Sequence, residues 1–218
     1  MELEQTLRMI LLYAIPGIFA ITLHEAAHGY AARQFGDLTA WQAGRITLNP
    51  LKHIDVMGTI VIPVILLIAS QGKYAFGWAK PVPVNFGHLR NPKRDMLWVA
   101  AAGPGANLVM AVMWAFVMKA ALGLPAGYFT EPLLMMARGG IIINAVLMVL
   151  NLLPLPPLDG GRIAVSLLPH RLAYRFARVE PYGLMIVLAL MLLGVLGRVM
   201  WPIVAAFIGV LAAVFNFS

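Results

Sequence analysis

Residues Leu23-His24-Glu25-Ala26-Ala27-His28 lie inside a strongly apolar stretch and dictate how the rest of the chain must be arranged. Side chains four residues apart share one face of an α-helix, so His24 and His28 can point their imidazoles at one metal ion. Glu25 lies one residue further round, where its carboxylate can reach a water molecule at the same ion. Two neutral imidazoles and a carboxylate base are the groups that zinc-assisted peptide hydrolysis uses. The alternative is a pair of core histidines with other partners.

The composition is that of an integral membrane protein. The chain has 218 residues, of which 61% are hydrophobic and 11% charged, and its mean hydropathy is +0.84. Soluble globular proteins carry about 25% charged residues. Because ionisable side chains are rare and costly in a membrane, the His24–His28 cluster predicts a functional site there. We expect a single domain over residues 1–218, with a motif core at 7–168 and a C-terminal helical pair at 182–217.

The net charge of +7 does not indicate a nucleic-acid partner, because no Lys- or Arg-rich run with interleaved aromatic residues is present. The basic residues gather in loops, which predicts a multi-pass protein with its active site toward the cytoplasmic side. The sequence contains no cysteine, so disulfides are excluded and any metal ligands must be His, Asp, Glu or Asn. Acidic residues at positions 2 and 4 are atypical of a cleavable signal peptide, so we expect an uncleaved first helix.

Hydrophobic patterning predicts an all-α polytopic fold with about five to six hydrophobic helices around the metal site. The expected long segments are Thr6–Gln34, Met96–Ala121, Arg138–Leu153, Tyr182–Gly197 and Val199–Phe217. The apolar segment Met57–Ser70 is shorter, and as a helix it would rise about 21 Å against about 30 Å of hydrocarbon. We therefore expect it to enter the membrane and return without crossing.

The polar segment between residues 71 and 95 predicts a short β-hairpin-like element associated with the membrane. Two short extended stretches, 74–78 and 82–86, flank the turn residues 79–81. The prolines remove amide donors, so at least one edge should stay unpaired within the chain. Such an edge could hold substrate as an added strand, and an aromatic interfacial loop is the alternative. The residues expected to form this platform are Gly77, Trp78, Val82, Val84 and Asn85.

A proline-rich break supplies the candidate third ligand. Residues 154–162, Pro-Leu-Pro-Pro-Leu-Asp-Gly-Gly-Arg, cannot continue an ordinary helix. Non-helical backbone at membrane depth is tolerated where it is buried in protein or lines a cavity, which makes Asp159 the candidate ligand. A helix N-cap is the alternative role for Asp159. We expect Asn107 to make an interhelical hydrogen bond and His53 to be a solvated loop histidine.

Three motifs in order resemble the site-2 protease family of intramembrane zinc metalloproteases. They are His24-Glu25-x-x-His28, Gly103-Pro104-x-x-Asn107, and Asn151-x-x-Pro154 followed by Leu158-Asp159-Gly160. The stretches 47–51, Thr-Leu-Asn-Pro-Leu, and 77–85, Gly-Trp-Ala-Lys-Pro-Val-Pro-Val-Asn, are similar to a small bacterial or archaeal branch of it.

The resemblance implies that His24, His28 and Asp159 bind one Zn²⁺ per chain and that Glu25 is the catalytic base. It also implies that Asn151 lies near the substrate. The implied activity is cleavage of membrane-embedded segments, in regulated intramembrane proteolysis or in clearance of membrane peptides. The partners would be a transmembrane or membrane-associated protein or peptide and the lipid bilayer of a prokaryotic cell membrane. The resemblance leaves the substrate and the oligomeric state open.

Two other classes of function are compatible with buried His, Glu and Asp residues. An ion or metal transporter would spread such groups along a path, and no second acidic cluster occurs in the apolar segments. A catalytically silent scaffold would keep a metal for stability, but it would not need a base such as Glu25. The motif combination favours the protease.

Overall fold

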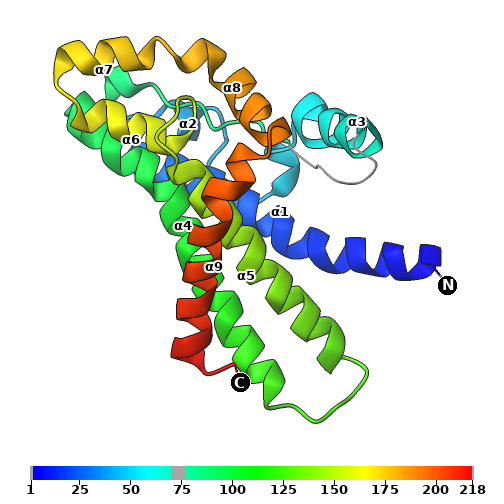
Figure 1. Cartoon of the computed structure of the whole chain (residues 1–218). Coiled ribbons are helices and arrows are strands. Elements are labelled where there is room, and N and C mark those ends of the chain that lie inside the picture. The colour runs from blue at the N-terminus through cyan, green and yellow to red at the C-terminus, as the bar shows by residue number, and fades with distance from the viewer. Residues whose placement is uncertain (1, 70–76, 218) are drawn as a thin grey trace.

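The computed structural model describes residues 2–69 and 77–217, with side chains from residue 11 onward, and every regular element in that part is helical (Figure 1). The helices are α1 Glu2–Gln34, α2 Thr39–Gln42, η1 Pro50–Lys52, η2 Val56–Val61, α3 Ile62–Ala69, η3 Phe86–His88, α4 Pro92–Leu122, α5 Thr130–Leu152, α6 Asp159–Leu167, α7 His170–Ala177, α8 Glu180–Leu192 and α9 Val195–Phe215. The predicted all-α class is confirmed for these residues. The predicted β-hairpin is not confirmed, because 70–76 lie outside the described residues and 77–85 form no strand.

Three of the described helices, α4, α5 and α9, are long and apolar enough to cross a membrane. The segments Val56–Ala69 and Glu180–Leu192 are apolar but shorter. The expected five to six spans are therefore not confirmed. Asp55 caps η2, since its carboxylate accepts a hydrogen bond from the Gly58 amide. Pro63 is the second residue of α3, which follows η2 without a break, so its missing amide hydrogen lies inside a continuous helical segment.

The helices form one assembly in which α4 and α5 run side by side and α1 lies across them (Figure 1). Helix α9 packs along α5 and α4, while α6 packs on α4. Small residues let the backbones approach: Ala111 and Ala115 of α4 pack with Ile141 of α5 and Leu211 of α9. A second core joins Val149 of α5 to residues of α8 and α9. The helices of the C-terminal pair therefore pack on α5, and α9 also packs on α4.

Several helix boundaries differ from those predicted. Helix α4 begins at Pro92, because proline suits the first turn of a helix, and Asp95 accepts the Asn91 amide from within that turn. Helix α5 begins at Thr130, well before the expected Arg138. The last two helices separate at Gly194, whose φ of +69° is left-handed, and not at residues 197–198.

Candidate metal centre

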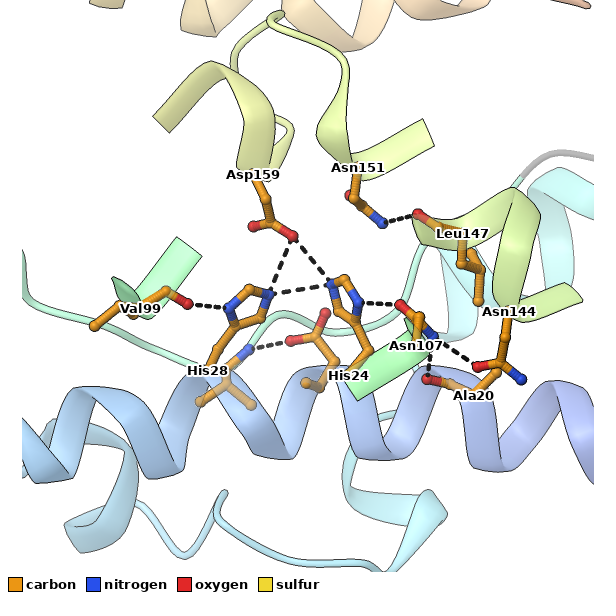
Figure 2. A network of polar contacts seen from close by, with 11 residues as sticks. Ala20, His24, His28, Val99, Asn107, Asn144, Leu147, Asn151 and Asp159 are labelled. Atoms are coloured by element: carbon orange, nitrogen blue, oxygen red, sulfur yellow. Dashed lines mark hydrogen bonds and ion pairs between the residues drawn. The ribbon is translucent and has the colours of Figure 1, made fainter. Parts of the chain in front are cut away.

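Three polar atoms from two helices converge on one point (Figure 2). Nε2 of His24 and Nε2 of His28, both on α1, lie 3.1 Å apart. Oδ2 of Asp159, the first residue of α6, lies 3.2 Å from the former and 3.3 Å from the latter. A tetrahedral zinc ion with bonds of about 2.0–2.1 Å holds its ligand atoms about 3.3 Å from one another. The nearly equilateral triangle therefore has the dimensions of one face of such a site.

The far side of each imidazole fixes which nitrogen carries the hydrogen. Nδ1 of His28 lies 2.7 Å from the Val99 carbonyl, which can only accept, so this nitrogen donates. Nδ1 of His24 lies 2.6 Å from Oδ1 of Asn107 and donates likewise. In the neutral imidazoles both Nε2 atoms then present lone pairs toward Asp159. The arrangement matches the tautomers that a metal ion requires.

The Asp159 carboxylate provides an independent test of fit. Its Oδ2 is buried and has no hydrogen-bond partner. Two imidazole lone pairs and a carboxylate oxygen at this spacing repel one another unless a cation lies between them. Within the part of the chain that the structure describes, His24, His28 and Asp159 form the sole group of this kind. The donor set thus fits a divalent metal such as zinc.

The proline-rich break explains how Asp159 reaches the histidines. Helix α5 ends at Leu152, and α6 starts at Asp159 with Leu158 as its cap residue. Asp159 therefore lies one position inside α6, and its side chain turns toward the imidazoles (Figure 2). The N-cap alternative for Asp159 is therefore wrong.

Asn107 contributes more to the site than the sequence suggested. As expected, it bridges helices: its Nδ2 donates to the Ala20 carbonyl on α1 and to Oδ1 of Asn144 on α5, at 3.2 and 2.9 Å. Asn144 in turn donates to the Gly140 carbonyl at 2.8 Å. These bonds orient the Asn107 amide so that its oxygen faces Nδ1 of His24 (Figure 2). Its contact with a ligand was not predicted, although the four-residue spacing from Gly103 placed both on one face of α4.

Gly103 lies directly against the ligand atoms. A Cβ at this position would lie 2.6 Å from Nε2 of His24 and closer still to Nε2 of His28. A Cβ at Gly105, two residues later, would meet nothing within 4 Å. The structure shows that Gly103 leaves open the space beside the candidate ligand nitrogens.

Glu25 lies on the side of α1 that faces the extended segment 77–85. Its Oε2 accepts a 2.8 Å hydrogen bond from the Val82 amide. The amides of Trp78 and Lys80 also donate inward, to the carbonyls of Gly58 and His53 at 3.0 and 2.9 Å. One edge of the expected substrate platform is therefore already used inside the chain. Of the platform residues, Val82 touches the site and Asn85 binds the loop after α1.

Asn151 and His53 are both polar residues whose side chains bind a backbone carbonyl. The Asn151 amide donates to the Leu147 carbonyl of its own helix at 3.1 Å, with its side chain beside the ligands (Figure 2). His53 is buried, with 2% of its surface exposed, and its Nε2 donates to the Thr47 carbonyl at 3.0 Å. The expectation that His53 is solvated was wrong, because the loop after α1 folds over it.

Asp37 holds the distal end of the same extended segment. Its buried carboxylate accepts hydrogen bonds from the Asn85 amide at 2.7 Å and the Thr39 amide at 3.0 Å, and His88 lies 3.6 Å away. Burial acts to raise the pKa of Asp37, but the Thr39 and Asn85 hydrogen bonds and His88 outweigh it, so the net pKa lies below its ordinary value. The carboxylate is thus a stable anchor in the ionised form.

Comparison with known proteins identifies the family of this chain. The model of peptidase family M50 matches residues 124–194, which include Asn151 and Asp159 but not the histidine pair. The chain is 40% identical over 196 residues to "Putative zinc metalloprotease YwhC" of Bacillus subtilis, covering 87% of this chain and 84% of that protein. It is 33% identical to "Putative zinc metalloprotease Rip2" of Mycolicibacterium smegmatis, covering 83% and 66%. The Rip2 protein of Mycobacterium tuberculosis is 32% identical, covering 70% and 54%. No solved structure matches the chain significantly.

Proposed function

This chain belongs to peptidase family M50 and is a zinc metalloprotease, and from that premise we propose that it hydrolyses peptide bonds of membrane-embedded substrate segments. The observation that carries the proposal is the triangle of Nε2, Nε2 and Oδ2 atoms, with sides of 3.1 to 3.3 Å. Glu25 follows His24 on the same helix, and the Val82 amide holds one oxygen of its carboxylate. His24, His28 and Asp159 are the proposed ligands of one zinc ion per chain. The chain is proposed to act as a single domain.

The proposed chemistry divides the work between the metal and the protein. When bound, zinc lowers the pKa of a coordinated water to about 7 and polarises a carbonyl. Glu25 takes a proton from the attacking water and later delivers it to the leaving amine nitrogen. The new C–O bond replaces the C–N bond, so one water is consumed and one carboxyl and one amine group are formed. Oε1 of Glu25 is the atom that accepts the proton, since Oε2 is held by Val82.

The decisive experiment replaces Glu25 by Gln. Glu25→Gln keeps every proposed ligand but removes the base, so we expect zinc content unchanged and cleavage reduced by about a thousandfold or more. Zinc is measured by elemental analysis of the purified protein. Cleavage is measured on a synthetic single-span peptide carrying a fluorophore and a quencher. Substantial residual cleavage by Glu25→Gln would refute the assigned role. In cells, membrane peptides that accumulate with this variant would identify the substrate.

Asn151 is proposed to stabilise the developing oxyanion or to contact the substrate. Its amide is oriented by its own helix beside the ligands, and its Nδ2 carries a second hydrogen that no described hydrogen bond uses. Losing one donor of this type slows turnover by about 100-fold. Asn151→Ala should therefore lower kcat while zinc content stays constant. Unchanged kinetics would reduce Asn151 to a packing residue.

The segment 77–85 is proposed to hold the substrate as an added strand on its outer edge. A membrane helix hides its amides, so substrate must unwind before a peptide bond can reach the metal. With the inner edge occupied by Gly58, His53 and Glu25, the carbonyls of Ala79 and Pro83 remain for a substrate strand. The Pro81 carbonyl between them accepts a 3.4 Å hydrogen bond from Arg45. Single cysteines along 77–85 should crosslink to substrate at every second residue. A helical pattern would contradict this arrangement.

The active site is proposed to lie toward the cytoplasmic side of a multi-pass protein in the cell membrane. Arg171, Arg175 and Arg178 lie on or beside α7, which with α8 arches over the end of the bundle opposite the α4–α5 loop (Figure 1). That loop, residues 123–129, carries no Lys or Arg. The difference agrees with the positive-inside rule. A membrane-impermeant reagent applied to sealed vesicles should label cysteines at Thr39 and Tyr128 from opposite sides, and labelling from one side would refute the topology.

A further inference from the structure

The sequence Pro81-Val82-Pro83 presents a single amide hydrogen to the site. Proline has no backbone N–H, so Val82 is the sole donor among these three residues. That donor points at Oε2 of Glu25, 2.8 Å away. A hydrogen bond to an ionised carboxylate is about twice as strong as one between neutral groups. The segment thus offers the carboxylate one fixed donor and no neighbouring amide that could replace it.

The Val82 amide continues a regular pattern along the segment. Alternate residues of an extended chain point their amides to one side. Trp78 donates to the Gly58 carbonyl and Lys80 donates to the His53 carbonyl, at 3.0 and 2.9 Å. Val82 is the next position in this register, but its acceptor is the Glu25 carboxylate and not a backbone carbonyl. At this position the Glu25 carboxylate therefore accepts the hydrogen bond that a backbone carbonyl of a neighbouring strand would otherwise accept.

Packing fixes the distance between this segment and α1. The Val82 side chain is buried, with 7% of its surface exposed. A Cβ on Gly29, one helical turn after Glu25, would lie 3.2 Å from Val82 and 2.9 Å from Ile46. Arg45 adds a clamp, since its guanidinium donates to the Lys80 carbonyl at 2.8 Å. The segment can therefore move relative to Glu25 only if these contacts change.

We infer that the Val82 amide is a positioning group that holds one oxygen of the Glu25 carboxylate so that the other faces the attacking water. This inference rests on the proposed function, in which Glu25 is the base. Because the same segment offers its outer edge to the substrate, substrate position and base orientation are set by one element. Residues 77–85 would then set the distance between the scissile bond and the Glu25 carboxylate.

The first test compares two substitutions at one position. Val82→Pro removes the amide hydrogen, and Val82→Ala keeps it while removing most of the side chain. We expect Val82→Pro to lower kcat about ten- to hundredfold, with KM within about twofold and zinc content unchanged, since a hydrogen bond to a charged group is lost. Val82→Ala should lower kcat by a clearly smaller factor. Equal losses of kcat in the two variants would overturn the inference and leave only a packing role.

The second test does not depend on the folding of Val82→Pro. In protein labelled with ¹⁵N-valine, the Val82 amide should exchange slowly with solvent, and Glu25→Ala should accelerate that exchange. The amide of Val149, in the α5 core, serves as the reference and should not change. Equal exchange of Val82 in the wild type and Glu25→Ala would overturn the inference. Activity retained by Glu25→Gln would instead refute the proposed function, so the two failures are distinguishable.

Discussion

The two flanks of α1 meet the rest of the molecule in different ways. On the ligand flank, His24 and His28 face α4 and α6 and are held by helix packing and by partners buried in those helices. On the Glu25 flank, α1 faces the extended segment 77–85, which is attached by separate polar groups: Glu25, Arg45 and Asp37. The first flank carries the candidate metal ligands, and the second attaches the segment that we propose receives the substrate.

This difference teaches where rigidity is needed. Metal ligands require tight tolerances, which packed helices supply because their backbones cannot shift independently. A substrate-binding element must exchange partners, and a few polar attachments allow that without disturbing the core. We therefore expect substitutions on the ligand flank to affect zinc, and substitutions on the Glu25 flank to affect kinetics.

The largest expected effect is that of Gly103→Ala. The added methyl group would enter the space beside both Nε2 atoms, so we expect the purified variant to lose most of its zinc and its activity. The matched control is Gly105→Ala, on the same helix, where a Cβ meets nothing within 4 Å and zinc should stay at the wild-type level. Elemental analysis of both proteins decides the matter. A wild-type zinc content in Gly103→Ala would contradict this expectation and show that the neighbouring helices move to make room for the methyl group.

An intermediate effect is expected for Asn107→Ala. This change removes the acceptor that orients His24, and loss of such a partner weakens metal affinity about 10- to 100-fold. Asn144→Ala, which removes a group one step further from the metal, should weaken it less. Zinc competition with a chelator measures both affinities. Equal affinities in the two variants would contradict a specific role for the Asn107–His24 contact.

The smallest effect is expected at Asp37, on the other flank. Because the pKa of Asp37 in the folded protein lies below its unfolded value of about 3.9, its contribution to stability is present above that pH and is lost as pH falls through the folded pKa. Asp37→Asn should lower stability by about 1–2 kcal/mol near neutral pH and leave zinc content unchanged. The difference from the wild type should shrink below about pH 4. Chemical unfolding in detergent at several pH values measures it, and a difference that does not vary with pH would contradict this role.

The sequence by itself determined the chemistry of this protein. The four-residue spacing of His24 and His28 puts both on one helical face whatever surrounds them, and the prolines after residue 153 must interrupt a helix before Asp159. Those rules act over a few residues, so they can be read from the chain. The long apolar segments likewise predicted helices. Helix propensity did not determine where these helices begin and end, as the start of α5 at Thr130 and the break at Gly194 show.

Only the tertiary structure determined which groups form hydrogen bonds with His24 and with Glu25. The Asn107 contact with His24 joins residues 83 apart, and the Val82 contact with Glu25 joins residues 57 apart. No periodic pattern in the sequence predicts these two contacts, because they depend on how α4 and the segment 77–85 pack on α1. The same docking buried His53 and determined which edge of the segment 77–85 is paired within the chain. Helix periodicity and the proline break predicted the candidate ligands, and long-range packing determined which groups form hydrogen bonds with His24 and Glu25.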